Sequence, residues 1–333
     1  DTASYSIARR FIAKGYRPPA AFIRMEEFVN AFDYQYPRTS DRTFSIYSEA
    51  APSPFGKDLI LLKIGVRGKV LGRDGRRPSH LTFVIDGSGS MGRDDRMPLV
   101  REALTTLLDH LDTQDRISIV TYSTQAQVLC ESVPVGQRVV LKSAIEQIQP
   151  NTSTNLLEGV KTGYQIARRN FKAGTNNRII LCSDGIANVG PDQAEDLLKQ
   201  VEEYRQTGIS LTSVGVGEGA YNDAIMESLS NKGDGNYVYI DTPTEARRIF
   251  SEELSATLQM IAKDVKIQVE FNPDRVRRYR LIGYENRDIA DEDFRNDKVD
   301  AGEIGSGQST TALYELELLP YTNDAQQAES RRG

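Results

Sequence analysis

Three oxygen-bearing side chains stand at two-residue intervals directly after an apolar and β-branched run. Asp86, Ser88 and Ser90 follow residues 81–85, and glycines separate them. A continuous run of this kind, bounded by glycines, is typical of a buried strand in a parallel sheet. The three side chains should therefore lie where the strand ends, in the crevice where open α/β sheets bind ligands. One carboxylate and two hydroxyls form an all-oxygen set that suits a small hard cation such as Mg²⁺.

The same residues also have an ordinary structural interpretation. Asp and Ser are common helix N-caps, and Pro98 favours a helix start shortly afterwards. Oxygen ligands from elsewhere in the chain would favour the metal, and two such segments are present. Thr154 lies in a polar stretch that opens a helical pattern after turn residues 150–151, and Asp184 directly follows a second apolar strand.

A strand with Asp-x-Ser-x-Ser, a loop threonine and a strand ending in Asp-Gly together resemble a metal-ion-dependent adhesion site. With these residues the chain resembles a von Willebrand factor type A domain. The resemblance implies that Ser88 and Ser90 bind the metal directly, and that Thr154 binds it directly or through water. It implies that Asp86 and Asp184 anchor the ion mostly through water. The implied ion is Mg²⁺ or Mn²⁺, with Ca²⁺ as a further option.

Such a site is expected to bind a carboxylate from another protein. Neutral hydroxyls and waters leave the cation under-neutralised, and Mg²⁺ tolerates exchange of one water for a carboxylate. The expected partner is therefore a protein that presents an acidic side chain. Two departures from the usual family pattern are present: Gly87 stands where a larger residue is usual, and Ile186-Ala187 stands where an acidic residue and an aromatic one are usual. Both departures concern the turn and the outer rim, and all five ligands are present.

Segments outside this domain are similar to one bacterial branch of the family, whose members are cell-envelope proteins and commonly lipoproteins. The resemblance implies a periplasmic or surface-exposed location, with membrane attachment only through a lipid anchor upstream of this chain. We expect the leader to be absent here, because the chain opens at Asp1 inside a matching motif and contains no signal peptide. The matching segments are residues 1–6, 26–30, 261–273, 279–287 and 311–315.

The periodicity of apolar residues predicts an α/β domain over residues 78–262. Strands alternate there with helices of about ten to fifteen residues, which indicates a doubly wound, mostly parallel sheet. Its last element is predicted to be a helix over 244–261. The strand before Asp86 and the strand before Asp184 belong to this sheet, so their carboxyl ends should lie at one edge.

The segments on either side predict two N-terminal helices and additional β-structure. Residues 1–42 predict two helices separated by Pro18-Pro19, and residues 43–77 predict two strands. Residues 263–333 predict strands at 265–271 and 311–318. Each flank alone offers too few strands for a core. We therefore expect 43–77 and 263–333 to form one discontinuous, sandwich-like β domain into which the α/β domain is inserted.

Charge and cysteine content argue against nucleic-acid binding and against a disulfide. The net charge of −6 does not favour nucleic acid, and the basic cluster at 275–280 is predicted to be the solvated face of a strand. Cys130 and Cys182 are predicted to be separate buried residues, because they fall in a peripheral and a central strand.

Enzymatic chemistry is not expected. Asp86 lacks a second Asp two residues later, and neither Ser88 nor Ser90 stands in a Gly-x-Ser-x-Gly elbow. Only His80 and His110 could supply an imidazole base, and both are predicted to be structural. The chain is therefore interpreted as a protein without catalytic residues.

Two alternatives remain open. One is a structural scaffold with a non-functional metal site. The other is dinucleotide binding, because Gly215, Gly217 and Ala220 match G-x-G-x-x-A after a strand, and Asp241 ends the next strand. The motif falls late in the sheet and not on its opening βαβ unit, which favours an ordinary glycine-rich turn.

Overall fold

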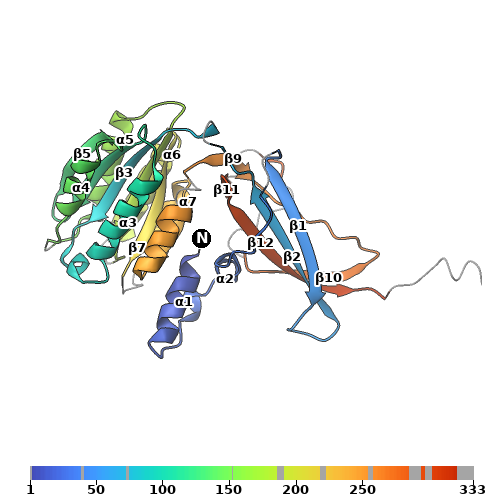
Figure 1. Ribbon diagram of the computed structural model, residues 1–333. Helices are drawn as coiled ribbons and strands as arrows, with labels where there is room; N and C mark the ends of the chain where they lie inside the picture. The colour runs from blue at the N-terminus through green and yellow to red at the C-terminus, as the bar shows by residue number, and fades with distance from the viewer. Residues whose placement is uncertain are drawn as a thin grey trace, which may run out of the picture.

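The computed structural model contains a six-stranded α/β unit and a separate antiparallel β-sheet, with N-terminal helices between them (Figure 1). In the described part of the chain, no helix is long and apolar enough to cross a membrane. The structure describes residues 2–38, 41–72, 75–151, 153–185, 191–217, 223–253, 258–284, 294–296 and 302–320.

The α/β unit is a mostly parallel sheet with the strand order β5-β4-β3-β6-β7-β8. Among the described strands of this sheet, β4 and β5 pair antiparallel and the other neighbours pair parallel. The doubly wound sheet expected from the sequence is therefore confirmed. Its strands are β3 (Ser79–Asp86), β4 (Arg116–Tyr122), β5 (Ala126–Pro134), β6 (Asn176–Ser183), β7 (Ile209–Val216) and β8 (Tyr237–Ile240).

Helices cover both faces of this sheet. Successive residues of the central strand point to opposite sides, so neighbouring residues pack against different helices. Phe83 and Ile85 pack into a core with α3 (Met97–His110) and α4 (Arg138–Glu146), whereas Val84 packs into a second core with α1 (Ala3–Ala13) and α5 (Leu156–Arg169). The helices are η3 (Gly89–Gly92), α3 (Met97–His110), α4 (Arg138–Glu146), α5 (Leu156–Arg169), α6 (Pro191–Arg205), α7 (Asp223–Lys232), α8 (Pro243–Arg248) and the π-helical turn η4 (Ile249–Glu253).

Strands from both flanks share one sheet. β2 (Leu59–Gly68) pairs with β1 (Phe44–Pro52) on one side and with β12 (Ser309–Leu318) on the other. β12 also pairs with β10 (Val276–Ile282), which gives the order β1-β2-β12-β10. The chain thus leaves this sheet, forms the α/β unit and returns. The proposed domain limits at residues 78 and 262 stay a prediction.

One helix and one strand expected from the sequence differ in extent from those in the structure. The helix predicted over 244–261 ends earlier, and residues from Met260 belong to β9 (Met260–Val265). β9 pairs with β11 (Gly302–Gly305), so a contact with a distant segment decides its conformation. The strand predicted at 265–271 is consequently not formed beyond Val265. Local alternation of apolar residues could not reveal that pairing.

The basic cluster in β10 is a solvated strand face, as expected. Arg280 pairs with Glu315 at 2.9 Å, and Arg278 pairs with Glu317 at 2.5 Å, both on the neighbouring β12. These arginine side chains are largely exposed. Their charge is therefore balanced within the sheet.

The N-terminal segment contacts both sheets. α1 (Ala3–Ala13) buries Ala3 and Ile7 in the α/β core, and it ends before Gly15, whose φ is +77°. After η1 (Ala20–Phe22), the short helix α2 (Met25–Asn30) reaches the flanking sheet. There the Asn30 amide donates to the Thr311 carbonyl at 3.1 Å and accepts from the Thr311 N–H at 2.7 Å. This segment therefore links the two units.

Candidate metal-binding site

The central strands β3 and β6 end side by side and bring two predicted ligand segments together. They run parallel with Ile85 opposite Cys182, so Asp86 lies next to Ser183. Asp86 is fully buried, and its Oδ2 accepts a hydrogen bond from Ser183 Oγ at 2.7 Å. Its Oδ1 accepts from the Ser88 N–H at 2.8 Å. Burial raises the pKa of Asp86, and the hydrogen bonds from Ser88 and Ser183 partly offset that rise.

Ser88 and Ser90 converge as the motif requires. The backbone at Ser88 is extended, and the 3₁₀ turn η3 that follows returns Ser90 toward it. The two Oγ atoms lie 3.0 Å apart. Ser88 is buried, whereas Ser90 is partly accessible. Two adjacent hydroxyl oxygens therefore face the same small region at the strand edge.

Asp184 is held by a residue that the sequence did not single out. The Nη1 of Arg96 bonds to Asp184 Oδ2 and donates to the Ser90 carbonyl at 3.1 Å. Both charged side chains are buried, with exposed fractions of 1% and 2% for the whole residues. An arginine in a polar loop carries no sequence signal for this role, because only the fold turns it inward. Ser183 was also missed, although a hydroxyl directly before Asp184 at a strand end was a usable signal.

The loop before α5 closes the remaining side of the site. The Asn151 N–H donates to the Gly87 carbonyl at 2.6 Å, and Asn155 Oδ1 caps α5 by accepting from the Glu158 N–H at 3.1 Å. Thr154, half-buried, lies within this loop. No hydrogen bond joins Thr154 to the other four predicted ligands in the described chain. The rim residues Ile186-Ala187 lie outside the described residues.

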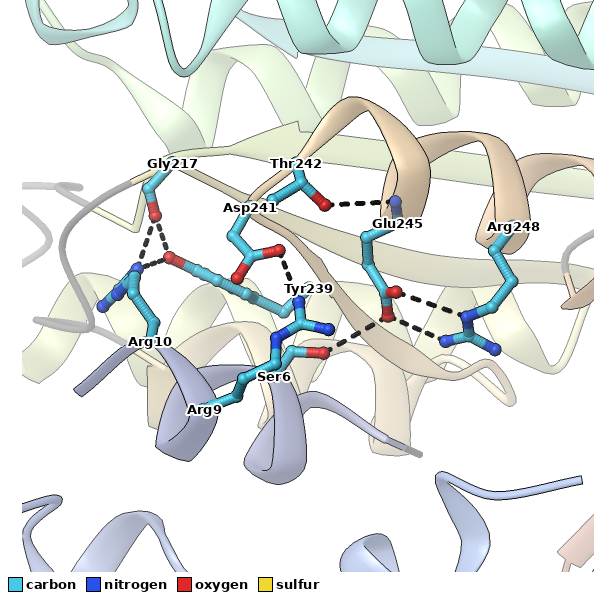
Figure 2. A network of polar contacts seen from close by, with 9 residues as sticks. All are labelled: Ser6, Arg9, Arg10, Gly217, Tyr239, Asp241, Thr242, Glu245 and Arg248. Atoms are coloured by element: carbon cyan, nitrogen blue, oxygen red, sulfur yellow. Dashed lines mark hydrogen bonds and ion pairs between the residues drawn. The ribbon is translucent and has the colours of Figure 1, made fainter. Parts of the chain in front are cut away.

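Gly217, the first residue after β7, is contacted by the N-terminal helix α1 (Figure 2). The Gly217 carbonyl accepts from Arg10 at 2.7 Å and from the Tyr239 hydroxyl. Asp241, the acidic residue expected for a dinucleotide ribose, pairs with Arg9 at 2.8 Å. These contacts favour a structural role for the turn over dinucleotide binding. Gly219 and Ala220 lie outside the described residues.

Gly217 also borders the metal-site residues. Its φ is +75°, and a Cβ atom at this position would lie only 2.3 Å from Arg96 Cγ. Glycine is required here for two reasons, because it permits the left-handed backbone and leaves room for the arginine. The contacts from Arg10 to Gly217 and from Gly217 to Arg96 connect α1 with Asp184.

The side chains present fit a divalent cation. Asp86, Asp184 and Arg96 together leave one net negative charge, which a divalent ion would reverse to one positive charge. The hydroxyls of Ser88 and Ser90 can turn their lone pairs to an ion between them. Among the described residues, no three His, Cys, Asp or Glu side chains gather as a metal-binding group. Binding would thus depend on hydroxyl and water ligands.

Comparisons with known proteins agree with this architecture. Three family models match: "von Willebrand factor" at residues 1–63, "von Willebrand factor type A domain" at 80–252, and "Uncharacterized protein YfbK, C-terminal" at 256–332. A solved structure described as "von Willebrand factor type A from Catenulispora acidiphila" is 15% identical, with a TM-score of 0.53, and covers 87% of this chain and 68% of that one. At this identity it supports the fold alone.

Two curated relatives are similar in sequence. "Uncharacterized protein YfbK" of Escherichia coli (strain K12) is 39% identical over 326 residues, covering 96% of this chain and 57% of the relative. "Uncharacterized protein sll0103" of Synechocystis sp. is 30% identical over 194 residues, covering 57% of this chain and 44% of the relative. The chain spans about half the length of these relatives. Since the domain model matches more than half of its residues, the chain belongs to the von Willebrand factor type A domain family.

Proposed function

We propose that this protein binds a partner protein through a divalent cation, as an adhesion or scaffolding component of the bacterial cell envelope. Proteins of this family generally act in protein–protein interaction and adhesion, and their domains commonly bind a divalent metal. In our proposal Ser88 and Ser90 ligate Mg²⁺ or Mn²⁺ directly. Thr154 joins them directly or through water, and Asp86 and Asp184 anchor the bound waters.

One observation carries this proposal: the hydroxyls of Ser88 and Ser90 lie 3.0 Å apart beside the buried carboxylate of Asp86. Asp86 already accepts from Ser88 and Ser183, so it can hold the loop and a metal-bound water without contacting the ion. Neutral ligands leave most of the charge of the cation available to an incoming group.

The chain contributes orientation and charge to partner capture. The pair of Arg96 and Asp184 removes one negative charge from the site, so the loaded site would carry net positive charge. A carboxylate from a partner would then be attracted and would replace a water on the cation. No covalent chemistry is needed for this function.

Calorimetry with Mg²⁺, together with binding of a short Asp-containing peptide, tests the proposal. We expect Ser88→Ala combined with Ser90→Ala to abolish both Mg²⁺ binding and Mg²⁺-dependent peptide binding. Ser228→Ala is the control, because Ser228 is a half-buried serine of α7 whose hydroxyl, within the described chain, donates to the Ala224 carbonyl of its own helix. Equal Mg²⁺ binding by the double variant and the wild type would refute the proposal.

A scaffold with a non-functional metal site is the second candidate, and the contact between Arg96 and Asp184 is the observation that favours it. A guanidinium already bonded to Asp184 supplies a positive charge at the site. If Arg96 takes the place of the metal, Mg²⁺ will bind neither to the wild type nor to any of the serine variants. The same calorimetric experiment therefore decides between the two functions.

A further inference from the structure

A polar hollow opens directly beside the candidate metal site. Its volume is about 410 Å³, and it is lined by the β4–β5 turn and by the loop before α5. The lining offers hydroxyl and amide groups, with no ionisable side chain and no aromatic ring among its residues. These residues are Ser123, Thr124, Gln125, Ala126, Gln127 and Asn151.

Gly87 forms a wall between the hollow and the metal loop. Its N–H donates to the Tyr122 carbonyl at 2.7 Å, directly before Ser123, and its carbonyl accepts from the Asn151 N–H at 2.6 Å. A Cβ at position 87 would lie 3.1 Å from the Tyr122 oxygen and 3.4 Å from the Gln149 oxygen. Glycine thus lets the two rims of the hollow approach the loop that carries Ser88.

The glutamine side chains of this hollow are accessible to a partner. Gln125 and Gln127 are both exposed, and within the described chain their side-chain amides make no hydrogen bond to the protein. A partner group that reached them would replace only water. Each neutral hydrogen bond gained in this way contributes modestly, so two of them would tune specificity more than they would drive binding.

We propose that this hollow receives an uncharged, hydrogen-bonding residue of the partner, next to the acidic residue captured by the metal. The inference rests on the proposed function and identifies what the partner segment looks like. A charged neighbour would lose water without meeting an opposite charge, because the lining has none. A sugar would find no aromatic ring to stack on, so a protein segment is favoured.

Synthetic peptides provide the test. Each peptide carries one Asp in a glycine background, with one flanking position replaced in turn by Asn, Lys or Glu, and affinity is measured by fluorescence polarisation in Mg²⁺. We expect Asn at one flanking position to improve the affinity up to about tenfold, whereas Lys and Glu at that position do not. Gln125→Ala combined with Gln127→Ala should remove this preference.

Two further variants sharpen the result. Gln165→Ala combined with Gln206→Ala is the matched control, because both side chains are exposed and lie outside the hollow; this variant should keep the preference for Asn. Gln127→Glu adds a negative charge to the lining and should shift the preference to the peptide with Lys. Mg²⁺ affinity without peptide should be the same in all of these variants.

Other outcomes would overturn the inference. If the peptides bind in an Mg²⁺-dependent way but the hollow variants keep the preference for Asn, the hollow has no role while the proposed function stands. If no peptide binding depends on Mg²⁺ or on Asp86, the proposed function fails as well. Tighter binding of a neutral oligosaccharide than of any peptide would also refute the inference about the hollow. Weaker Mg²⁺ binding by the glutamine variants would refute it too, because the hollow would then not be separate from the metal site.

Discussion

Arg96 and Asp184 form a buried ion pair at the edge of the sheet, between the loop after β3 and the end of β6. Arg96 also bonds to the Ser90 carbonyl, so one guanidinium connects two of the predicted ligand segments. Within the described chain, this pair places a cationic side chain next to the proposed metal position. Its removal should therefore affect both stability and metal binding.

Arg96→Met should destabilise the metal-free protein by about 3–5 kcal/mol, because it removes the guanidinium that forms an ion pair with the buried carboxylate of Asp184. Mg²⁺ should recover part of this loss, so the Mg²⁺-induced rise in Tm should be larger in the variant than in the wild type. Urea unfolding and thermal scans, with Mg²⁺ and with chelator, measure both effects. Arg138→Met is the control, because the pair of Arg138 and Asp109 is exposed and contributes at most about 1 kcal/mol.

Ser183→Ala should cost about 1–3 kcal/mol of unfolding free energy, since it removes a hydrogen bond from the buried carboxylate of Asp86. Ser213→Ala on the adjacent strand is a matched control. Ser213 is also fully buried, but its hydroxyl has no hydrogen-bond partner in the described chain, so its loss should be nearly neutral. Equal costs for the two variants in urea unfolding would contradict the role assigned to Ser183.

Gly217→Ala should be more damaging than Gly174→Ala, although both glycines have similar positive φ angles of +75° and +78°. At Gly174 no atom lies within 4 Å of the added Cβ, so only backbone strain of about 1–2 kcal/mol is expected. At Gly217 the Cβ also meets Arg96 Cγ. Mg²⁺ binding should be measured by calorimetry for both variants. Weaker binding by Gly217→Ala, with unchanged binding by Gly174→Ala, would show that the close approach of Gly217 to Arg96 supports the metal site.

Glu245→Gln should weaken the attachment of α1 in a pH-dependent way. Burial alone would raise the pKa of Glu245, but Arg248, with Arg9 and Ser6, holds that pKa below its usual value. A carboxyl whose pKa is lowered by folding stabilises the protein above its unfolded pKa, near 4.5, and loses this effect as the pH falls through its folded pKa. The stability difference from wild type should therefore be present at neutral pH and shrink below 4.5.

Urea unfolding across this pH range measures the difference for Glu245→Gln. Glu195→Gln serves as the comparison, because Glu195 pairs with Lys199 on an exposed helix face and should contribute little at any pH. A difference for Glu245→Gln that stays constant down to acid pH would indicate lost packing in place of lost charge.

Local sequence was sufficient to predict the elements that carry the metal motif. Asp86 and Asp184 each follow a run of apolar residues, so burial of those runs places both carboxylates at strand ends, whatever the remaining fold. Asn155 similarly marks the start of α5 through its own side-chain cap. These features depend on short-range patterns and on the burial of apolar surface.

Short-range patterns therefore specify the α/β alternation and the loops that bear Asp86, Ser88, Ser90, Thr154 and Asp184. Long-range contacts decide that Arg96 turns inward to Asp184, that β9 pairs with β11, and that Arg10 of α1 bonds to Gly217. These arrangements join residues that are far apart in the chain. Their energies depend on which neighbours exclude water from them, and a linear pattern of residue types does not contain that information.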